Sequence, residues 1–91
     1  MVYQITYELK NPQWDYSGLF IAIKQLSNAY AHPITPLWFV VSHLQANDLY
    51  DQLVNHISRQ TDKLIISETN IQNIQGWVGN EFWNWLRHQQ S

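Results

Sequence analysis

The side chains that most often do chemistry in proteins are sparse in this chain and follow no recognisable spacing. Cysteine is absent, which excludes disulfides, thiolate zinc sites and cysteine nucleophiles. No serine stands on a recognisable nucleophile elbow, and the three glycines form no phosphate-binding loop. None of the four histidines shows a zinc-ligand spacing such as HxxxH; they stand at His32, His43, His56 and His88. The residues alone therefore define no catalytic motif.

Aromatic side chains are the most prominent candidates for binding. The chain has five Trp, five Tyr and three Phe, more than one small core can bury, which predicts self-association as a homodimer. Trp77, Trp83 and Trp85 are close together in the sequence and could stack nucleobases. Single-strand binders combine such aromatics with a positive groove, whereas Arg87 is the one cation beside them. The preferred prediction is that these tryptophans contact the core, a second copy or a protein partner.

Composition and charge limit the classes of function. The 91 residues suffice for one domain, and the formal net charge of −2 disfavours binding driven by phosphate contacts. The first residues lack the basic and apolar regions of a signal peptide, and no apolar run approaches the ~20 residues of a membrane span. A cytoplasmic protein without a membrane partner is predicted.

Hydrophobic periodicity predicts the elements that must position any site. Period-2 alternation and short apolar runs predict four strands, at residues 2–9, 31–36, 37–42 and 64–66. The second, which contains two prolines, is predicted to be an edge strand, and the third a central strand. Helical spacing predicts three helices, at residues 16–29, 47–59 and 81–88. Asp15 and Asn80 are predicted to cap the first and last of them.

This order predicts an α+β fold of ferredoxin-like βαββαβ topology. The antiparallel sheet would carry the two long helices on one face, and a short C-terminal helix would follow. Residues 1–91 are predicted to form one domain, with residues 70–91 as an aromatic C-terminal extension.

Several of these segments resemble small bacterial proteins related to CRISPR-associated protein two, in the SinR-like and VapD-like branch. The resemblance extends over about residues 2–68, and its specificity is greater for fold than for activity. The segments that carry it are the strand end Ile5–Leu9, Pro12, Asp15–Tyr16, Leu19, 22–26, 35–40, 49–53 and 62–66.

The resemblance implies a homodimeric, nucleic-acid-associated protein, with the possible activity of a metal-dependent ribonuclease or nuclease of toxin type. The family's signature is an acidic residue, usually Asp, after the aromatic that ends the first strand. Glu8 after Tyr7 occupies that position here, so the resemblance implies Glu8 as catalytic residue and Mg²⁺ ligand. Asp15 and His43 are candidates to assist it, His43 as a proton shuttle.

Each of these site residues also has a structural explanation. Glu8 can be a solvated carboxylate at a strand end, Asp15 a helix cap, and His43 the polar end of an apolar strand. A second function therefore stays open, a non-catalytic protein-interaction module that uses the aromatic C-terminal segment. The substitution of Glu for the usual Asp and the acidic balance favour this alternative, and the resemblance favours the nuclease.

Overall fold

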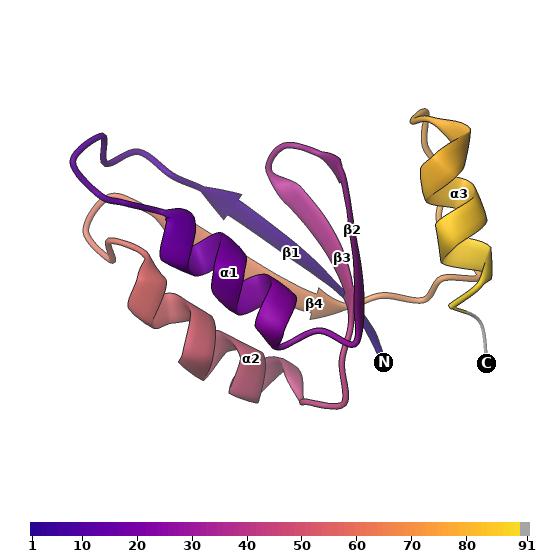
Figure 1. The fold of residues 1–91 in the computed structure, drawn as a ribbon, viewed down its shortest axis with the longest axis horizontal. Helices are drawn as coiled ribbons and strands as arrows, with labels where there is room; N and C mark the ends of the chain where they lie inside the picture. Colours follow the sequence, from indigo (N-terminus) through magenta and orange to yellow (C-terminus); the bar gives the residue numbers. More distant parts are fainter. Residues whose placement is uncertain (90–91) are drawn as a thin grey trace.

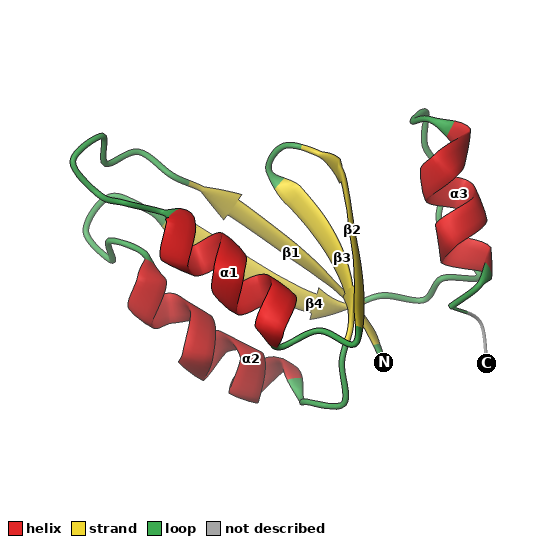
Figure 2. Ribbon diagram, viewed as in Figure 1, coloured by secondary structure: helices red, strands yellow, loops and turns green. Residues whose placement is uncertain are grey.

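A four-stranded antiparallel sheet forms the centre of the computed structural model, which describes residues 1–89 (Figures 1 and 2). The strands are β1 (Val2–Glu8), β2 (Ala29–Ile34), β3 (Leu37–Val41) and β4 (Lys63–Glu68). The helices are α1 (Ser17–Gln25), α2 (Ala46–Leu53) and α3 (Asn80–Arg87), and a short 3₁₀ turn, η1 (Val54–His56), extends α2. The predicted α+β class is thus confirmed. No helix within residues 1–89 combines the length and the apolar character needed to cross a membrane.

The strands lie in the order β2-β3-β1-β4, so β1 and β3 are interior and β2 and β4 form the two edges. The prediction that 37–42 is central and the proline-containing strand before it is an edge is confirmed. Proline cannot donate a ladder hydrogen bond, which explains why Pro33 lies in an edge strand. In β1 alternate side chains point to opposite faces of the sheet, so its two sets of residues meet different partners.

One face of the sheet packs against α1 and α2 (Figure 1). Tyr3, Ile5 and Tyr7 of β1 are buried there together with Leu19 of α1 and Leu49 of α2. Apolar residues at helical spacing place both helices on this face, as the sequence predicts. This layer is the main core of the protein.

On the opposite face of the sheet, α3 and the segment before it cover β2 and β3. Val2 and Phe39 are buried there against Phe82 and Leu86 of α3. Figure 1 shows α3 on the far side of the sheet from α1 and α2. The C-terminal helix therefore builds a second, smaller core.

The element ends differ from the predictions at several points. The helix predicted over 16–29 ends at Gln25, because the chain joins the sheet at Asn28, whose N–H donates to Val41 O at 2.7 Å. The helix predicted over 47–59 ends at Leu53 and continues as η1 to His56.

The two predicted caps are each displaced by one residue. Tyr16 is the N-cap residue of α1, and Asp15 precedes it. Gly79 is the N-cap residue of α3, and Asn80 is its first helical residue. Both predicted caps were wrong, because α1 begins one residue later than a cap at Asp15 requires, and α3 begins one residue earlier than a cap at Asn80 requires.

Candidate functional site

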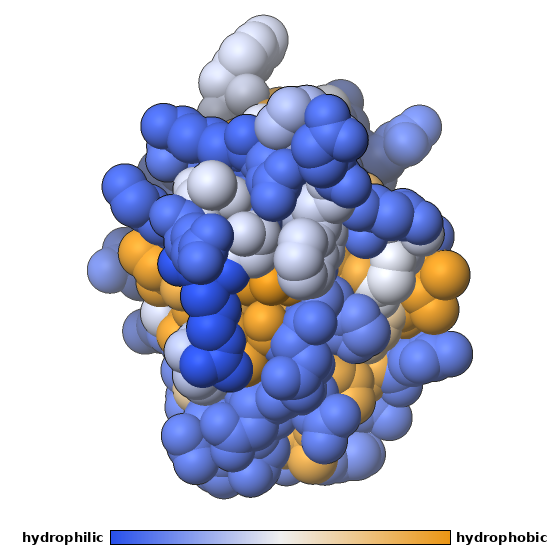
Figure 3. Space-filling model, turned by 90° about the vertical axis from the view of Figure 1, so that its left-hand side faces the viewer, coloured by the Kyte–Doolittle hydropathy of each residue, from blue (hydrophilic) through white to orange (hydrophobic). Residues whose placement is uncertain are grey.

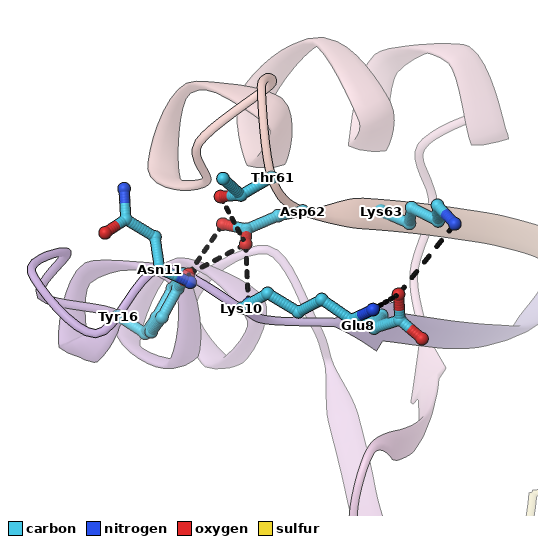
Figure 4. A network of polar contacts seen from close by, with 7 residues as sticks. All are labelled: Glu8, Lys10, Asn11, Tyr16, Thr61, Asp62 and Lys63. Carbon is cyan, nitrogen blue, oxygen red and sulfur yellow. Dashed lines mark hydrogen bonds and ion pairs between the residues drawn. The ribbon is translucent and has the colours of Figure 1, made fainter.

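Glu8 is the last residue of β1 and lies opposite Lys63 of β4 in the antiparallel register (Figure 4). Its Oε1 atom is 3.2 Å from Lys10 Nζ and 3.8 Å from Lys63 Nζ. The Glu8 side chain is 49% exposed, so these ion pairs are at the surface. Two cations therefore flank the carboxylate to which the resemblance assigns the catalytic role.

This arrangement does not by itself provide a divalent-metal site. The two ammonium groups are next to the oxygen that would bind Mg²⁺, and they would have to move away. Among residues 1–89, no three His, Cys, Asp or Glu side chains are close enough together to hold a metal ion. Hard cations such as Mg²⁺ require several oxygen ligands, so further ligands would have to come from outside one chain.

His43 lies at the other end of the sheet from Glu8. It follows β3, whose Val41 is opposite Val2 at the start of β1. Six residues of extended strand, at about 3.3 Å each, separate that end from Glu8, a distance of about 20 Å. The prediction that His43 could act beside Glu8 is wrong, because β3 runs antiparallel to β1.

Asp15 is exposed and interacts with the start of its own helix. Its Oδ1 atom accepts the backbone N–H of Ser17 at 2.9 Å. This hydrogen bond, and a further one with the Ser17 side chain, lower the pKa of Asp15. The carboxylate thus stabilises the first turn of α1 although it is not the N-cap residue.

A buried carboxylate near Glu8, that of Asp62, was not singled out from the sequence (Figure 4). Asp62 accepts the backbone N–H of Lys10 and of Ser58, each at 2.8 Å. It also accepts the Tyr16 hydroxyl at 2.7 Å and the Thr61 hydroxyl at 3.1 Å. One side chain therefore joins the end of β1, the start of α1 and the loop before β4.

The hydrogen bonds determine the direction of the Asp62 pKa. Burial alone would raise it, but the two backbone N–H groups and the hydroxyls of Tyr16 and Thr61 stabilise the anion and lower the pKa below the usual value. Burial and the hydrogen bond to Asp62 both raise the pKa of Tyr16. With all its oxygens occupied by donors from its own chain, Asp62 acts as a structural anion. A single Asp before a strand gave no signal of this role.

The loops around Asp62 form one end of the molecule. Figure 3 shows that hydrophilic side chains predominate on this face, with smaller hydrophobic areas between them. This end therefore offers polar groups rather than one continuous apolar surface.

The three tryptophans assigned to contacts with a partner differ in their surroundings. Trp83 and Trp85 are half-buried and pack around Phe82, at ring-centroid distances of 5.1 and 6.3 Å. Trp77 is 98% exposed. The first two contribute to the small core under α3, and Trp77 is available for external contacts.

An apolar groove lies between the β2–β3 hairpin and the segment that carries Trp77, and we call it the Trp77 groove. Its volume is about 220 Å³. Ile34, Leu37 and Phe39 line it from the sheet side, and Ile74 and Trp77 from the other side, together with Val78, Phe82 and Trp83. The groove is lined mainly by apolar side chains and includes the exposed tryptophan.

Comparisons with known proteins give no relative for this chain. No family model, no curated protein and no solved structure matches it. The site is therefore interpreted from its own geometry.

Proposed function

We propose that the chain is a non-catalytic protein-interaction module that binds an apolar segment of a partner protein in the Trp77 groove. The observation that carries the proposal is the 98% exposure of Trp77 on a segment that is itself held in place. Ile74 and Val78, on either side of Trp77, are half-buried and pack against the core under α3. A large exposed apolar side chain beside an apolar recess is typical of an interaction site.

The size and chemistry of the groove favour a protein segment as its ligand. Sites for drug-sized molecules usually enclose about 300–1,000 Å³, whereas the Trp77 groove has about 220 Å³. That volume suits one or two apolar side chains of a longer segment. The nearby helix α3 carries Glu81 and Arg87, which balance each other, so charge does not favour nucleic acid here.

We further propose that the domain has the ferredoxin-like topology. The chain order β1-α1-β2-β3-α2-β4 supports it. The position of β1 and β3 in the middle of the antiparallel sheet gives additional support, since the split βαβ units then interleave. In this proposal, residues 70–91 remain a C-terminal extension of one domain.

A displayed library of random peptides tests the binding proposal directly. Peptides selected on the wild-type chain should be rich in apolar residues. They should lose about tenfold or more in affinity for Trp77→Ala, since a central aromatic contact is worth more than 1 kcal/mol. Tyr50→Ala is the matched control, because Tyr50 is 41% exposed and belongs to α2 on the opposite face. A failure to select any peptide, or equal binding by both variants, would refute the proposal.

A second candidate function is the nuclease implied by the resemblance, with Glu8 as the catalytic residue of a homodimer acting on nucleic acid. One observation favours it: Lys10 and Lys63 are both beside Glu8, so two of the chain's five cations are available to phosphates at that point. Incubation of the wild-type chain and Glu8→Gln with single-stranded RNA and DNA in the presence of Mg²⁺ tests this function. Cleavage by the wild type that is lost in Glu8→Gln would support it, and absence of wild-type cleavage would exclude it.

A further inference from the structure

The two edges of the sheet differ in how well they are protected against pairing with another strand. The β2 edge contains Pro33 and a register irregularity between Ala31 and Ile34, and both features hinder strand addition. The β4 edge is six residues long, contains no proline and pairs with β1 in an unbroken register. Within residues 1–89, no strand pairs with the outer side of β4.

The hydrogen bonds of β1 show which backbone groups of β4 are free to pair. Thr69 N–H donates to Val2 O at 2.8 Å, so Thr69 and Val2 form a hydrogen-bonded pair of the antiparallel ladder. Such pairs recur at every second residue along β4. Ser67, Ile65 and Lys63 accordingly direct their backbone groups toward β1. The N–H and C=O groups of Leu64, Ile66 and Glu68 then point away from the sheet.

The side chains of β4 are suited to contact with another strand. Ile65 is 66% exposed and points to the face of the sheet opposite that of Leu64 and Ile66, so its apolar surface is open to contact with another strand. Leu64 and Ile66 are half-buried and pack against the main core. Charged residues occur at the two ends, Lys63 and Glu68, and have opposite signs.

We propose that a second copy of the chain pairs with the β4 edge in antiparallel orientation, about a two-fold axis at Ile65. In this register the outward N–H and C=O groups of Leu64 in each copy lie opposite those of Ile66 in the other copy. The two Ile65 side chains then lie next to each other and cover each other's exposed surface. Lys63 of each strand lies opposite Ser67 of the other copy, so no like charges flank the two isoleucines, and the match of Ile65 with itself favours a second copy over an unrelated peptide.

The proposed pairing leaves the Trp77 groove accessible. The groove lies beside β2 and β3, whereas β4 is the opposite edge of the sheet. Self-pairing and partner binding therefore use different surfaces and can be tested separately. An interface built on one strand is small, so we expect the affinity of a transient dimer.

Charge substitutions at Ile65 test the two-fold arrangement. Sedimentation at increasing concentration should show the wild type moving from the 10.8 kDa chain mass toward twice that value. Ile65→Lys alone and Ile65→Glu alone should remain monomeric, because each places like charges side by side. An equimolar mixture of the two variants should pair again. Ile21→Lys is the matched control, because Ile21 is 54% exposed on α1, and it should dimerise like the wild type.

Amide hydrogen exchange on the unmodified chain provides a second measurement that needs no variant. The N–H groups of Leu64 and Ile66 should exchange more slowly as the concentration rises, and those of Ile34 on the β2 edge should not change. A wild type that stays monomeric at millimolar concentration would overturn the proposal. Failure of the Lys and Glu mixture to pair would overturn the two-fold register, and peptide binding at β4 by a monomeric wild type would show that the edge serves another protein.

Discussion

Replacement of Asp62 by Asn should destabilise the fold far more than an ordinary surface substitution. Asp62 accepts hydrogen bonds from four groups, the backbone N–H of Lys10 and Ser58 and the hydroxyls of Tyr16 and Thr61. An Asn side chain retains one acceptor oxygen, and its NH₂ group would face donors. About two donors would be left without an acceptor, at about 1–3 kcal/mol each. We therefore expect a loss of about 2–6 kcal/mol in the free energy of unfolding.

Urea denaturation at neutral pH measures this loss. Asp51→Asn is the matched control, because Asp51 is exposed on α2, and its substitution should change the free energy of unfolding by less than about 0.5 kcal/mol. A loss below about 1 kcal/mol in Asp62→Asn would refute the argument that Asp62 holds three segments together. A small domain has about 5–15 kcal/mol of stability in total, so the expected loss is a substantial fraction of it.

The pH dependence provides an independent check on the same carboxylate. The pKa of Asp62 is lowered in the folded protein, so its contribution is fully present above the unfolded value of about 3.9. The contribution is lost as the pH falls below that value and through the folded pKa. The difference in stability between the wild type and Asp62→Asn should therefore be constant near neutral pH and shrink below about pH 4. A difference that persists unchanged in acid would show that the charge of Asp62 is not the cause.

Three further predictions follow from other contacts. Glu8→Gln removes two exposed ion pairs and should lower the free energy of unfolding by less than about 1 kcal/mol, measured in urea, so any loss of activity in this variant cannot be ascribed to unfolding. Trp38→Phe removes the indole N–H that donates to the Tyr7 hydroxyl at 3.0 Å. Burial raises the pKa of Tyr7 and this hydrogen bond lowers it, so absorbance titration should show a higher Tyr7 pKa in the variant. An unchanged pKa would contradict the contact. His32 is exposed, but its ring stacks on Trp38 at a centroid distance of 4.1 Å, and this partial burial and the charge of Lys24 lower its pKa. NMR titration should therefore give a pKa below 6.5 for His32, and the stability linked to its neutral form should be lost as the pH falls through the unfolded value.

The sequence predicted the strands and the helix faces well because periodicity determines them. The alternation in residues 2–9 and the apolar run 37–42 correspond to β1 and β3, which are interior in the sheet. Helix ends were less predictable, since α1 ends where Asn28 bonds to Val41 on a strand remote in sequence. Local pattern specifies which face is apolar, and tertiary contacts decide where an element stops.

The candidate site was predicted less well because it depends on register. The position of Glu8 at the end of a strand was predicted, but its contact with Lys63 follows from the pairing of β1 with β4. The separation of His43 from Glu8 follows from the direction of β3. Trp77 and Trp83 were grouped because they are close in sequence, whereas the loop exposes the first and the helix half-buries the second.

The difference between the two edges of the sheet also determines how far an assembly of this chain can grow. A sheet with two open edges can add copies without end, which is the route to fibrils. Within residues 1–89 the irregularity and Pro33 hinder strand addition at the β2 edge, so β4 is the more open edge of the sheet. Pairing at β4 about a two-fold axis uses the open edge of both copies at once and leaves closed edges on the outside. In the proposed pairing the assembly therefore ends at two chains, and Pro33 in β2 hinders further growth.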